Sequence, residues 1–321
     1  MTLLRVFTVA AAVLWAGFAA AQSFPAKPVK IVVPWPTGGG ADYVARTFGN
    51  ELSKVWGQPV IVENLAGAGS IVGASRVAQS PPDGYTLMLT INGTLVGNRF
   101  LYKQLAYDPD RSFVPVSLLV QSGQLILASS ALPVSSMREL VEYAKREPEK
   151  VAYASYGLGT QPHLSFEIMN KRENIKMLHV PYKGLAPAIS SVMGNDVQLT
   201  IVSPSSATAA IQSGRAKAIA IGSDTRGSTL PDVPTVAESG FPYMRSTIWF
   251  GLFAPAGTPS SIVDKIQGDI VRVTSNAGFS KGLSDRGFDV MASDGTKLSA
   301  MIKEEVGRTA EMVEAAGVKP E

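Results

Sequence analysis

Three glycine-bearing loops are the parts of this sequence best suited to bind a small anion. They are residues 34–42, 67–70 and 157–160, and each lies between an apolar run typical of a strand and a helical pattern. Glycine lets a backbone N–H approach a ligand closely, and the following helix offers unpaired N–H groups at the positive end of its dipole. Glycine can equally serve only to make a tight turn. Three loops in equivalent positions favour a ligand site.

The middle loop also invites comparison with nucleotide-binding sites. Residues 67–73 read Gly-Ala-Gly-Ser-Ile-Val-Gly, which spaces the glycines as GxGxxxG rather than GxGxxG. A dinucleotide fingerprint further requires an acidic residue about 20 positions on, where this chain reads Thr-Ile-Asn-Gly-Thr over residues 90–94. The pattern therefore does not predict a nucleotide, and we expect no cofactor.

Side chains suited to catalysis are few. The chain has only two histidines, His163 and His179, and contains neither an HExxH metal motif nor a GxSxG nucleophile motif. His163 falls in the first turn of a helix expected to begin at Thr160, where it either faces a ligand or serves as a hydrogen-bonded structural residue. His179 lies in an apolar run and is expected to be structural. We predict no metal site and no enzymatic activity; the alternative is an exported enzyme that uses His163 as its general base.

The first residues predict export. Arg5 precedes an apolar run over residues 6–20, and Ala19 and Ala21 ahead of Gln22 fit the small-x-small rule for leader cleavage. The run of about 15 residues is shorter than the roughly 20 that a spanning helix needs, which favours a signal peptide, residues 1–21, over a retained anchor. Without a cysteine for a lipid anchor, the mature chain is expected to be a soluble, periplasmic monomer.

Composition narrows the classes further. The 321 residues include no cysteine, so disulfides and thiolate metal sites are excluded. Lys and Arg total 29 against 26 Asp and Glu, and no basic run stands out, so we predict no nucleic-acid partner. A chain of this length exceeds a typical single domain, and two domains are expected.

Apolar runs and helical patterns alternate along the chain. Ser136 with Glu139 forms a capping box that opens a helix. Thr258 is expected to cap another helix before Pro259, and Gly317 should end a last helix that begins near residue 295. The alternation predicts an α/β fold with mainly parallel sheets flanked by helices. The expected strands are residues 29–34, 60–64, 86–90, 114–120, 125–128, 151–155, 177–180, 197–202, 216–221 and 250–253.

Six segments, in order along the chain, resemble the substrate-binding receptors of tripartite tricarboxylate transporters, the Bug-type periplasmic proteins. One segment alone would be a weak indication, whereas six in the family's order make a specific match over nearly the whole mature chain. The segments are residues 34–46, 62–70, 82–87 (PDGYTL), 179–184 (HVPYKG), 230–240 (LPDVPTVAESG) and 254–259 (APAGTP).

The resemblance implies a two-lobed Venus-flytrap fold of the type II periplasmic binding class. Lobe one would comprise residues 24–125 plus 240–321, and lobe two residues 126–239. The resemblance also implies a carboxylate captured by lobe closure and, as partner, the permease subunits of a tripartite membrane transporter. Carried over by position, the ligand contacts are Thr37, Gly38, Gly39, Asp42, Ala68, Gly69, Ser70, Thr90, Asn92, Gly159, Thr160, His163 and Ser203.

The chain departs from the family in residues 197–203, where many members carry acidic residues. Gln198 and Val202 stand at those places. Because an Asp would pair with the ammonium group of an amino acid, its absence argues against an amino-acid ligand. We therefore expect a mono- or dicarboxylate, aliphatic or aromatic. The sequence does not separate delivery to a transporter from reporting to a membrane sensor.

Overall fold

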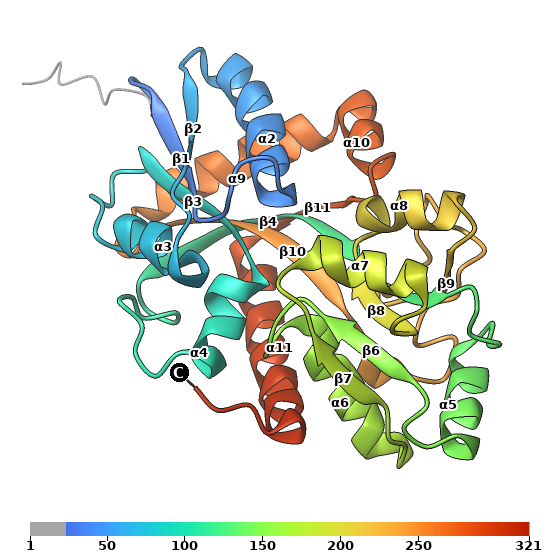
Figure 1. Ribbon diagram of the computed structural model, residues 1–321. Coiled ribbons are helices and arrows are strands. Elements are labelled where there is room, and N and C mark those ends of the chain that lie inside the picture. Colours follow the sequence, from blue (N-terminus) through green and yellow to red (C-terminus); the bar gives the residue numbers. More distant parts are fainter. Residues whose placement is uncertain (1–23, 321) are drawn as a thin grey trace, which may run out of the picture.

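The computed structural model describes residues 24–320 and shows two lobes, each built on a β-sheet with helices on both faces (Figure 1). The lobe-one sheet has the order β11-β4-β10-β3-β1-β2, and the lobe-two sheet has the order β7-β6-β8-β5-β9. The strands of lobe one are β1 (Val29–Val33), β2 (Val60–Asn64), β3 (Thr86–Ile91), β4 (Phe113–Gly123), β10 (Thr247–Pro255) and β11 (Asp289–Asp294). The strands of lobe two are β5 (Leu125–Ser129), β6 (Ala152–Ser155), β7 (Leu178–Pro181), β8 (Leu199–Val202) and β9 (Ala216–Ile221).

The two-lobed α/β fold is confirmed, but the sheets are mixed rather than mainly parallel. Strand β1 pairs in parallel with β2 and β3, and β6 pairs in parallel with β7 and β8. Strands β4, β5 and β10 pair antiparallel with their neighbours. These three strands flank the points where the chain passes between the lobes, so they do not belong to simple strand–helix–strand repeats.

Strand β11 was not predicted from the sequence. It reads Asp-Val-Met-Ala-Ser-Asp and lies at the edge of its sheet. Polar residues are common on edge strands, where one side of the ladder faces away from the core. The polar residues of β11 leave it without the apolar run from which the other strands were predicted.

Helices bury one face against each side of the sheets. In α2, Val44, Phe48 and Leu52 recur every fourth residue and are buried on one face of the lobe-one sheet, while α3 packs on the opposite face. The helices of lobe one are α2 (Gly40–Trp56), α3 (Ile71–Ala78), α4 (Asn98–Leu101), α9 (Ser260–Thr274) and α10 (Ala277–Ser284), with the short turns η2 (Ala68–Ser70) and η3 (Gly93–Gly97). The helices of lobe two are α5 (Met137–Arg146), α6 (Gln161–Glu173), α7 (Leu185–Gly194) and α8 (Pro204–Gln212), with the turn η4 (Pro242–Met244).

The helix ends confirm one predicted cap and correct another. The Ser136 side chain accepts the N–H of Glu139 at 3.2 Å, and the Glu139 carboxylate accepts an N–H just ahead of the cap at 2.7 Å. The predicted capping box of α5 is therefore present. Thr258 does not cap α9, because Pro259 occupies the cap position. The Thr258 hydroxyl instead donates to the Pro255 carbonyl at 2.8 Å.

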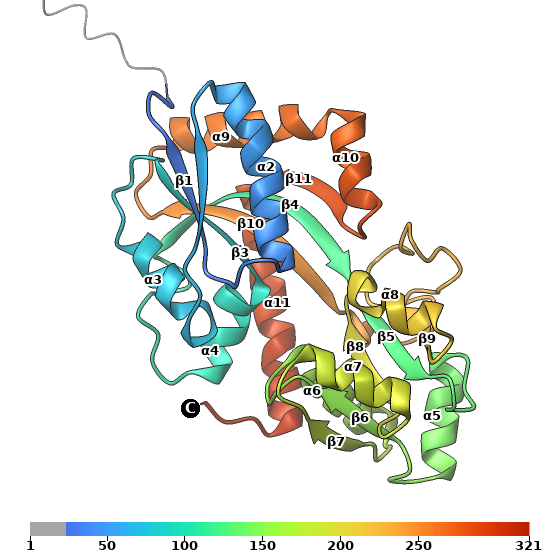
Figure 2. The ribbon, with the colours of Figure 1, turned by 45° about the horizontal axis from the view of Figure 1, so that its top comes forward.

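The chain crosses between the lobes from β4 to β5 and returns from β9 to β10 (Figure 2). Three backbone hydrogen bonds join the crossing segments. Gln124 N–H donates to the Ser246 carbonyl at 2.8 Å, Ser246 N–H to the Gly222 carbonyl at 3.0 Å, and Gly222 N–H to the Gln124 carbonyl at 2.8 Å. We refer to these three residues as the hinge.

Helix α11 (Gly295–Ala316) is a third connection between the lobes. Near its start Leu298 is buried in the lobe-one core, and near its end Met312 is buried in the lobe-two core. It ends at Gly317 in the left-handed conformation (φ 62°), as predicted. Figure 2 shows α11 running from one lobe to the other. Because this helix belongs to both cores, the lobe boundaries given above stay a prediction.

The predicted signal peptide, residues 1–21, lies outside the described residues. Across residues 24–320, no helix combines the length and apolar composition required to span a bilayer. The same part of the chain contains no group of three or more His, Asp or Glu side chains placed to hold a metal ion.

Candidate functional site

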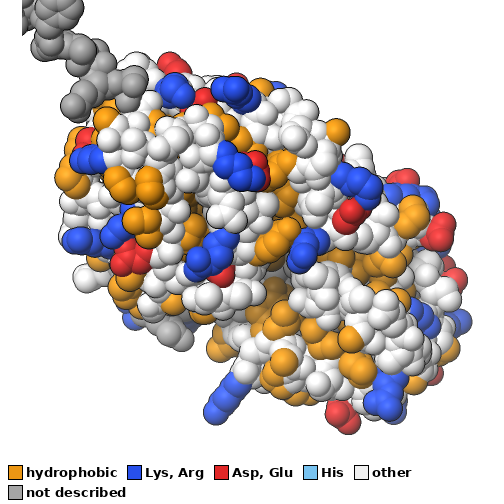
Figure 3. Space-filling view, turned by 90° about the horizontal axis from the view of Figure 1, so that it is seen from above, with side chains coloured by type: hydrophobic (Ala, Val, Ile, Leu, Met, Phe, Trp, Pro, Cys, Tyr) orange, Lys and Arg blue, Asp and Glu red, His pale blue; other side chains and the backbone are white. Residues whose placement is uncertain are grey.

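A cavity of about 720 Å³ lies between the lobes, a volume typical of small-molecule sites. Its lobe-one wall comprises the start of α2 and the segment between α10 and β11, and its lobe-two wall comprises α8 and residues 229–230. Figure 3 shows the hollow between the lobes from above. The lining residues are Gly38, Gly39, Gly40, Tyr43, Pro204, Ser205, Thr208, Ile211, Gln212, Thr229, Leu230, Asp285, Arg286 and Phe288.

The first glycine loop opens into this cavity. Gly39 is the cap residue of α2, and no side chain caps the helix. The first N–H groups of α2 therefore lack intrahelical partners and lie at the positive end of the helix dipole. Thr37 is exposed beside Gly38 and Gly39 at the tip of the loop. This arrangement offers backbone donors to an anion.

Asp42 fixes the shape of the first loop. Its carboxylate accepts the Gly38 N–H at 3.0 Å and pairs with Arg46 at 2.9 Å. Arg46 also donates to Asn64 at 3.0 Å, and the Asn64 amide donates to the Trp35 carbonyl at 3.1 Å. Burial would raise the pKa of Asp42, but hydrogen bonds from Arg46, Gly38 and Asn64 outweigh burial and hold that pKa below its usual range. Asp42 is therefore an ionised structural group, and its contact with ligand stays a prediction.

The second glycine loop is held by a chain of hydroxyl groups inside lobe one. Thr94 donates to the Ser70 hydroxyl at 2.8 Å, and Thr90 lies 2.5 Å from Thr94. Ser70 is 2% exposed and Thr90 is fully buried. Their hydroxyls are engaged with neighbours in lobe one, so the loop offers a ligand mainly the backbone of Ala68 and Gly69, which both have positive φ.

Two further predicted contacts have structural partners. The Asn92 amide donates to the Glu305 carboxylate at 2.9 Å, which ties the end of β3 to α11. Ser203 caps α8 by accepting the Ser206 N–H at 3.3 Å. Within this turn, the neighbouring Ser205 lines the large cavity.

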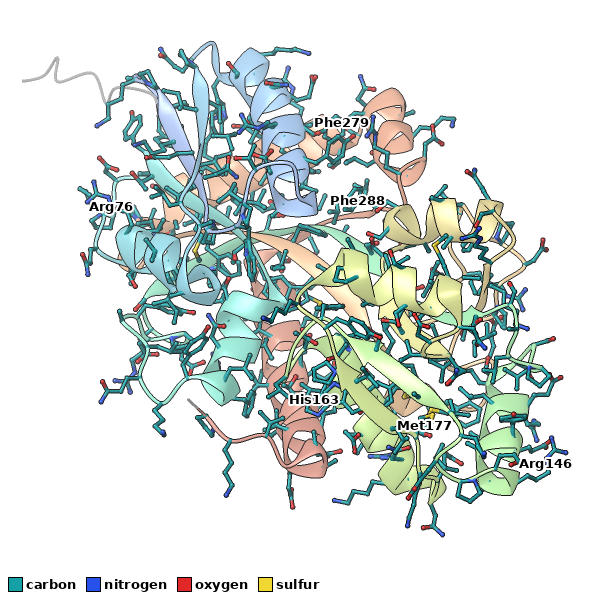
Figure 4. All side chains as sticks on the ribbon, viewed as in Figure 1. Arg76, Arg146, His163, Met177, Phe279 and Phe288 are labelled. Carbon is teal, nitrogen blue, oxygen red and sulfur yellow. The ribbon has the colours of Figure 1, made fainter. Side chains whose placement is uncertain are left out.

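The third glycine loop is ordered by His163. The imidazole Nδ1 accepts the N–H of Gly159 at 3.0 Å, and the Thr160 hydroxyl donates to the Gly157 carbonyl at 2.6 Å. The ring of His163 stacks on His179 with centroids 4.1 Å apart and planes at 10°. Figure 4 shows His163 where α6 approaches α11. His163 thus has a structural role, and its contact with ligand stays a prediction.

Both imidazoles are held in the neutral form. Burial lowers the pKa of His163, although the nearby Glu167 carboxylate opposes the effect. Burial and the neighbouring His163 lower the pKa of His179 to about 4. Ser155 Oγ lies 2.7 Å from His179 Nε2. Because the stacked His163 and His179 rings are uncharged, they can hold the third glycine loop in place without a counter-ion.

A second cavity, of about 470 Å³, lies beside the third loop. The structure therefore divides the predicted contacts between two spaces: Gly38 and Gly39 line the larger, and His163 lines the smaller. Gly69 packs against Tyr102, which lines the smaller space, since a Cβ atom on Gly69 would lie 2.6 Å from the Tyr102 hydroxyl. The lining residues of the second cavity are Leu101, Tyr102, Leu158, His163, Ala316, Gly317, Val318 and Lys319.

Of the residues that line the larger cavity, only Gly38 and Gly39 were identified from the sequence as ligand contacts. Three of the others form a cluster. The Arg286 guanidinium carbon lies 4.7 Å from the ring centroid of Tyr43. Tyr43 stacks on Phe288 at 5.8 Å with planes at 18°. These residues come from opposite ends of the described chain, no motif marks them, and the fold alone brings them together.

Comparison with protein families gives a match over most of the chain. The model of the tripartite tricarboxylate transporter family receptor matches residues 44–318. A protein from the tcbD-tcbE intergenic region of Pseudomonas sp. (strain P51) is 35% identical over 293 residues, which cover 91% of this chain and 87% of the relative. Protein BugT of Bordetella pertussis is 32% identical over 95% of this chain and 94% of its own.

Solved structures share the two-lobed arrangement. Periplasmic binding protein BugD is 35% identical with a TM-score of 0.73, over 93% of this chain and 100% of that chain. Rpa4515 of R. palustris, solved with adipate, is 30% identical with a TM-score of 0.79 over 93% of this chain and 100% of its own. MatC of Rhodopseudomonas palustris, with bound malate, is 33% identical with a TM-score of 0.73 over 90% and 100%. The resemblance inferred from the six sequence segments is confirmed.

Proposed function

Because this chain belongs to the tripartite tricarboxylate transporter receptor family, we propose that it captures a small organic carboxylate between its lobes in the periplasm and delivers it to a membrane permease. Members of the family are solute-binding receptors rather than enzymes. Two relatives solved with adipate and malate support a carboxylate ligand. The signal peptide predicted at residues 1–21 and the periplasmic relatives support export.

The observation that carries the proposal is the uncapped start of α2 at the wall of the larger cavity. Gly39 and Gly40 line that wall, and the nearest atom to a Cβ built on Gly39 is the Pro36 carbonyl oxygen at 3.6 Å. A carboxylate can therefore approach the backbone donors directly. Hydrogen bonds to an ionised acceptor are stronger than neutral ones. Several of them could supply the roughly −8 kcal/mol of micromolar binding after the ordering costs.

Closure of the lobes would complete the site. The lobes meet on one side where the Ser228 hydroxyl donates to the Ser284 carbonyl at 3.1 Å. On the other side, Gly159 packs against Leu101. A ligand shifts an equilibrium between open and closed arrangements only by its difference in affinity for the two. A carboxylate bound by lobe one would favour closure through its added contacts with lobe two.

The site assignment is tested by placing a carboxylate where the ligand should bind. Gly39→Glu introduces a negative side chain at the start of α2 in a position with room for it, so the protein should still fold. Gly268→Glu is the matched control, because Gly268 is exposed on α9 with no atom near its Cβ position. Wild-type protein should gain roughly 2.7 kcal/mol of stability from a bound acid at 100 times its dissociation constant. The Gly268 variant should keep this gain and the Gly39 variant should lose it; a retained gain in both would refute the assignment.

Delivery to a permease is tested in cells. Deletion of the receptor should abolish uptake of the labelled acid that binds it, and the wild-type gene should restore uptake. Loss of a transcriptional response with normal uptake would instead assign the protein to a membrane sensor.

A further inference from the structure

We infer that the part of the larger cavity bounded by Arg286, Tyr43 and Phe288 is a second carboxylate subsite, and that the ligand is a dicarboxylate with an apolar spacer between its acid groups. This inference rests on the proposed function, since the first acid group is assigned to the start of α2. The inference adds a site for the second acid group of the ligand, and assigns recognition of that group to Arg286.

Arg286 is positioned by aromatic side chains. It lies between α10 and β11, and its guanidinium carbon stands 4.7 Å above the Tyr43 ring. Tyr43 stacks on Phe288, which packs edge-on against Phe250 at 5.4 Å and 79°. A guanidinium over an aromatic face gains a favourable interaction and keeps its in-plane N–H groups free. Figure 4 shows Phe288 in the region between α10 and α8.

The charge of Arg286 is available to a ligand. Of the residues that line the cavity, only Asp285 and Arg286 are charged. Both oxygens of Asp285 accept from Lys281, at 2.6 and 2.8 Å. Within residues 24–320, no carboxylate lies within 4.0 Å of Arg286. The guanidinium fork matches the geometry of a carboxylate, which it binds through two parallel hydrogen bonds.

The lobe-two wall of the cavity, opposite Arg286, suits the apolar spacer of a dicarboxylate and lies close to the second acid group. Ile211 and Leu230 supply apolar surface from lobe two, beside the polar side chains of Thr208 and Gln212. The lobes are close at this end, because a Cβ atom on Gly287 would lie 3.5 Å from Pro204. A chain of carbon atoms between the two acid groups would therefore lie against Phe288 on one side and helix α8 on the other.

The test compares acids that share a carbon skeleton and differ in the second carboxylate. Hexanoate is paired with adipate, and benzoate with terephthalate. Calorimetry on the wild-type protein should give a dissociation constant at least tenfold lower for the diacid in at least one pair. In Arg286→Gln this preference should shrink to about twofold, and Arg286→Lys should retain part of it because the charge stays. Arg272→Gln, an exposed arginine on α9, is the matched control and should keep the full preference.

The outcomes separate this inference from the proposed function. Equal affinities for monoacids and diacids in the wild-type protein would overturn the second subsite and leave carboxylate capture standing. A diacid preference that survives in Arg286→Gln would show that Arg286 only packs on Tyr43, and would also overturn the inference. A wild-type protein that binds none of the four acids would overturn the inference, while the proposed function would still be decided by the Gly39→Glu and Gly268→Glu comparison. Thermal unfolding of each variant without ligand verifies that the fold is intact.

Discussion

Leu101 of lobe one fills the space that a Cβ atom on Gly159 of lobe two would occupy, since its Cδ2 atom lies 2.2 Å from that position. Gly159 has a φ of 71° and its N–H is bonded to His163. The lobes thus meet here through bare backbone on one side and a leucine side chain on the other. A side chain at residue 159 would therefore have to displace the Leu101 side chain from this contact.

Replacement of Gly159 by alanine should hold the lobes apart. The methyl group would overlap Leu101, and a left-handed alanine costs roughly 1–2 kcal/mol in addition. We expect ligand affinity to fall at least tenfold and the radius of gyration of the liganded protein to increase, as measured by calorimetry and small-angle scattering. Gly214→Ala is the control, because Gly214 has a φ of 70° with no atom within 4 Å of its Cβ position. An equal loss of affinity in both variants would assign the effect to backbone strain instead.

Stability should depend on pH through His179. Its pKa is about 4 in the folded protein against an ordinary value of 6.5, so the unfolded chain binds this proton more readily. The stabilisation is complete above about pH 6.5 and is lost as the pH falls toward 4. Allowing for partial exposure, the loss should be on the order of 2 kcal/mol. Urea unfolding from pH 7 to pH 4 should show a shallower decline in His179→Gln than in the wild-type protein; identical slopes would contradict the prediction.

The hinge should not tolerate a side chain at Gly222. A Cβ atom there would lie 2.4 Å from the Ser246 carbonyl oxygen and 2.6 Å from its nitrogen, and backbone atoms cannot move aside cheaply. Gly222→Ala should therefore lower the free energy of unfolding by about 2 kcal/mol or more. Gly307→Ala should raise it by roughly 0.5–1 kcal/mol, because Gly307 lies inside α11 with open space around it. Urea titrations measure both effects, and a neutral Gly222 variant would show that the hinge is loosely packed.

Much of the fold follows from local patterns in the sequence. Ten strands lie where apolar runs predicted them, and the caps at Ser136 and Gly317 act within a single turn of chain. Such features depend on residues a few positions apart, so the printed sequence is sufficient to find them. Strand β11 could not be found in this way, because polar residues interrupt it. The start of α9 was misplaced by one residue, because Pro259 is compatible both with the cap position, where it lies, and with the first helical position, where it was expected.

The site was less accessible to sequence reasoning, because its side chains are assembled by the fold. The glycine loop ahead of α2 could be found, since glycines mark it. The partners of Ser70 and Thr90 in lobe one could not be foreseen, because their hydrogen bonds depend on how η2, η3 and β3 pack. Arg286 lies near Tyr43 in the fold, just ahead of β11, which pairs with β4 at the edge of the lobe-one sheet. A surface arginine in an unmarked loop carries no pattern that distinguishes it beforehand.

Glu305 should be the most important carboxylate for the stability of the connection between the lobes. It is 7% exposed on α11, where it accepts the indole N–H of the fully buried Trp249 at 2.5 Å and the amide of Asn92 at 2.9 Å. Glu305→Ala would leave the buried indole N–H of Trp249 unsatisfied, at a cost of about 1–3 kcal/mol. It would also remove one of two acceptors of the half-buried Asn92 amide, which still donates to the Thr247 carbonyl at 3.1 Å. Because removal of a buried charge offsets part of these losses, we expect a net loss of about 1–3 kcal/mol in the free energy of unfolding.

The adjacent Glu304 provides the matched control. Its side chain is 69% exposed, and its salt bridge to Arg245 is long, at 3.5 Å. Exposed ion pairs contribute little, so Glu304→Ala should change the free energy of unfolding by less than about 0.5 kcal/mol. Glu305→Gln should recover part of the loss, because one amide oxygen still accepts from Trp249 or Asn92. Urea unfolding followed by tryptophan fluorescence measures all three variants, and quenching of Trp249 emission reports on its release from the core. If the Glu305 and Glu304 variants unfold alike, the bonds to Trp249 and Asn92 add little, and the apolar contacts of α11, including Leu298 and Met312, account for its attachment to the two lobes.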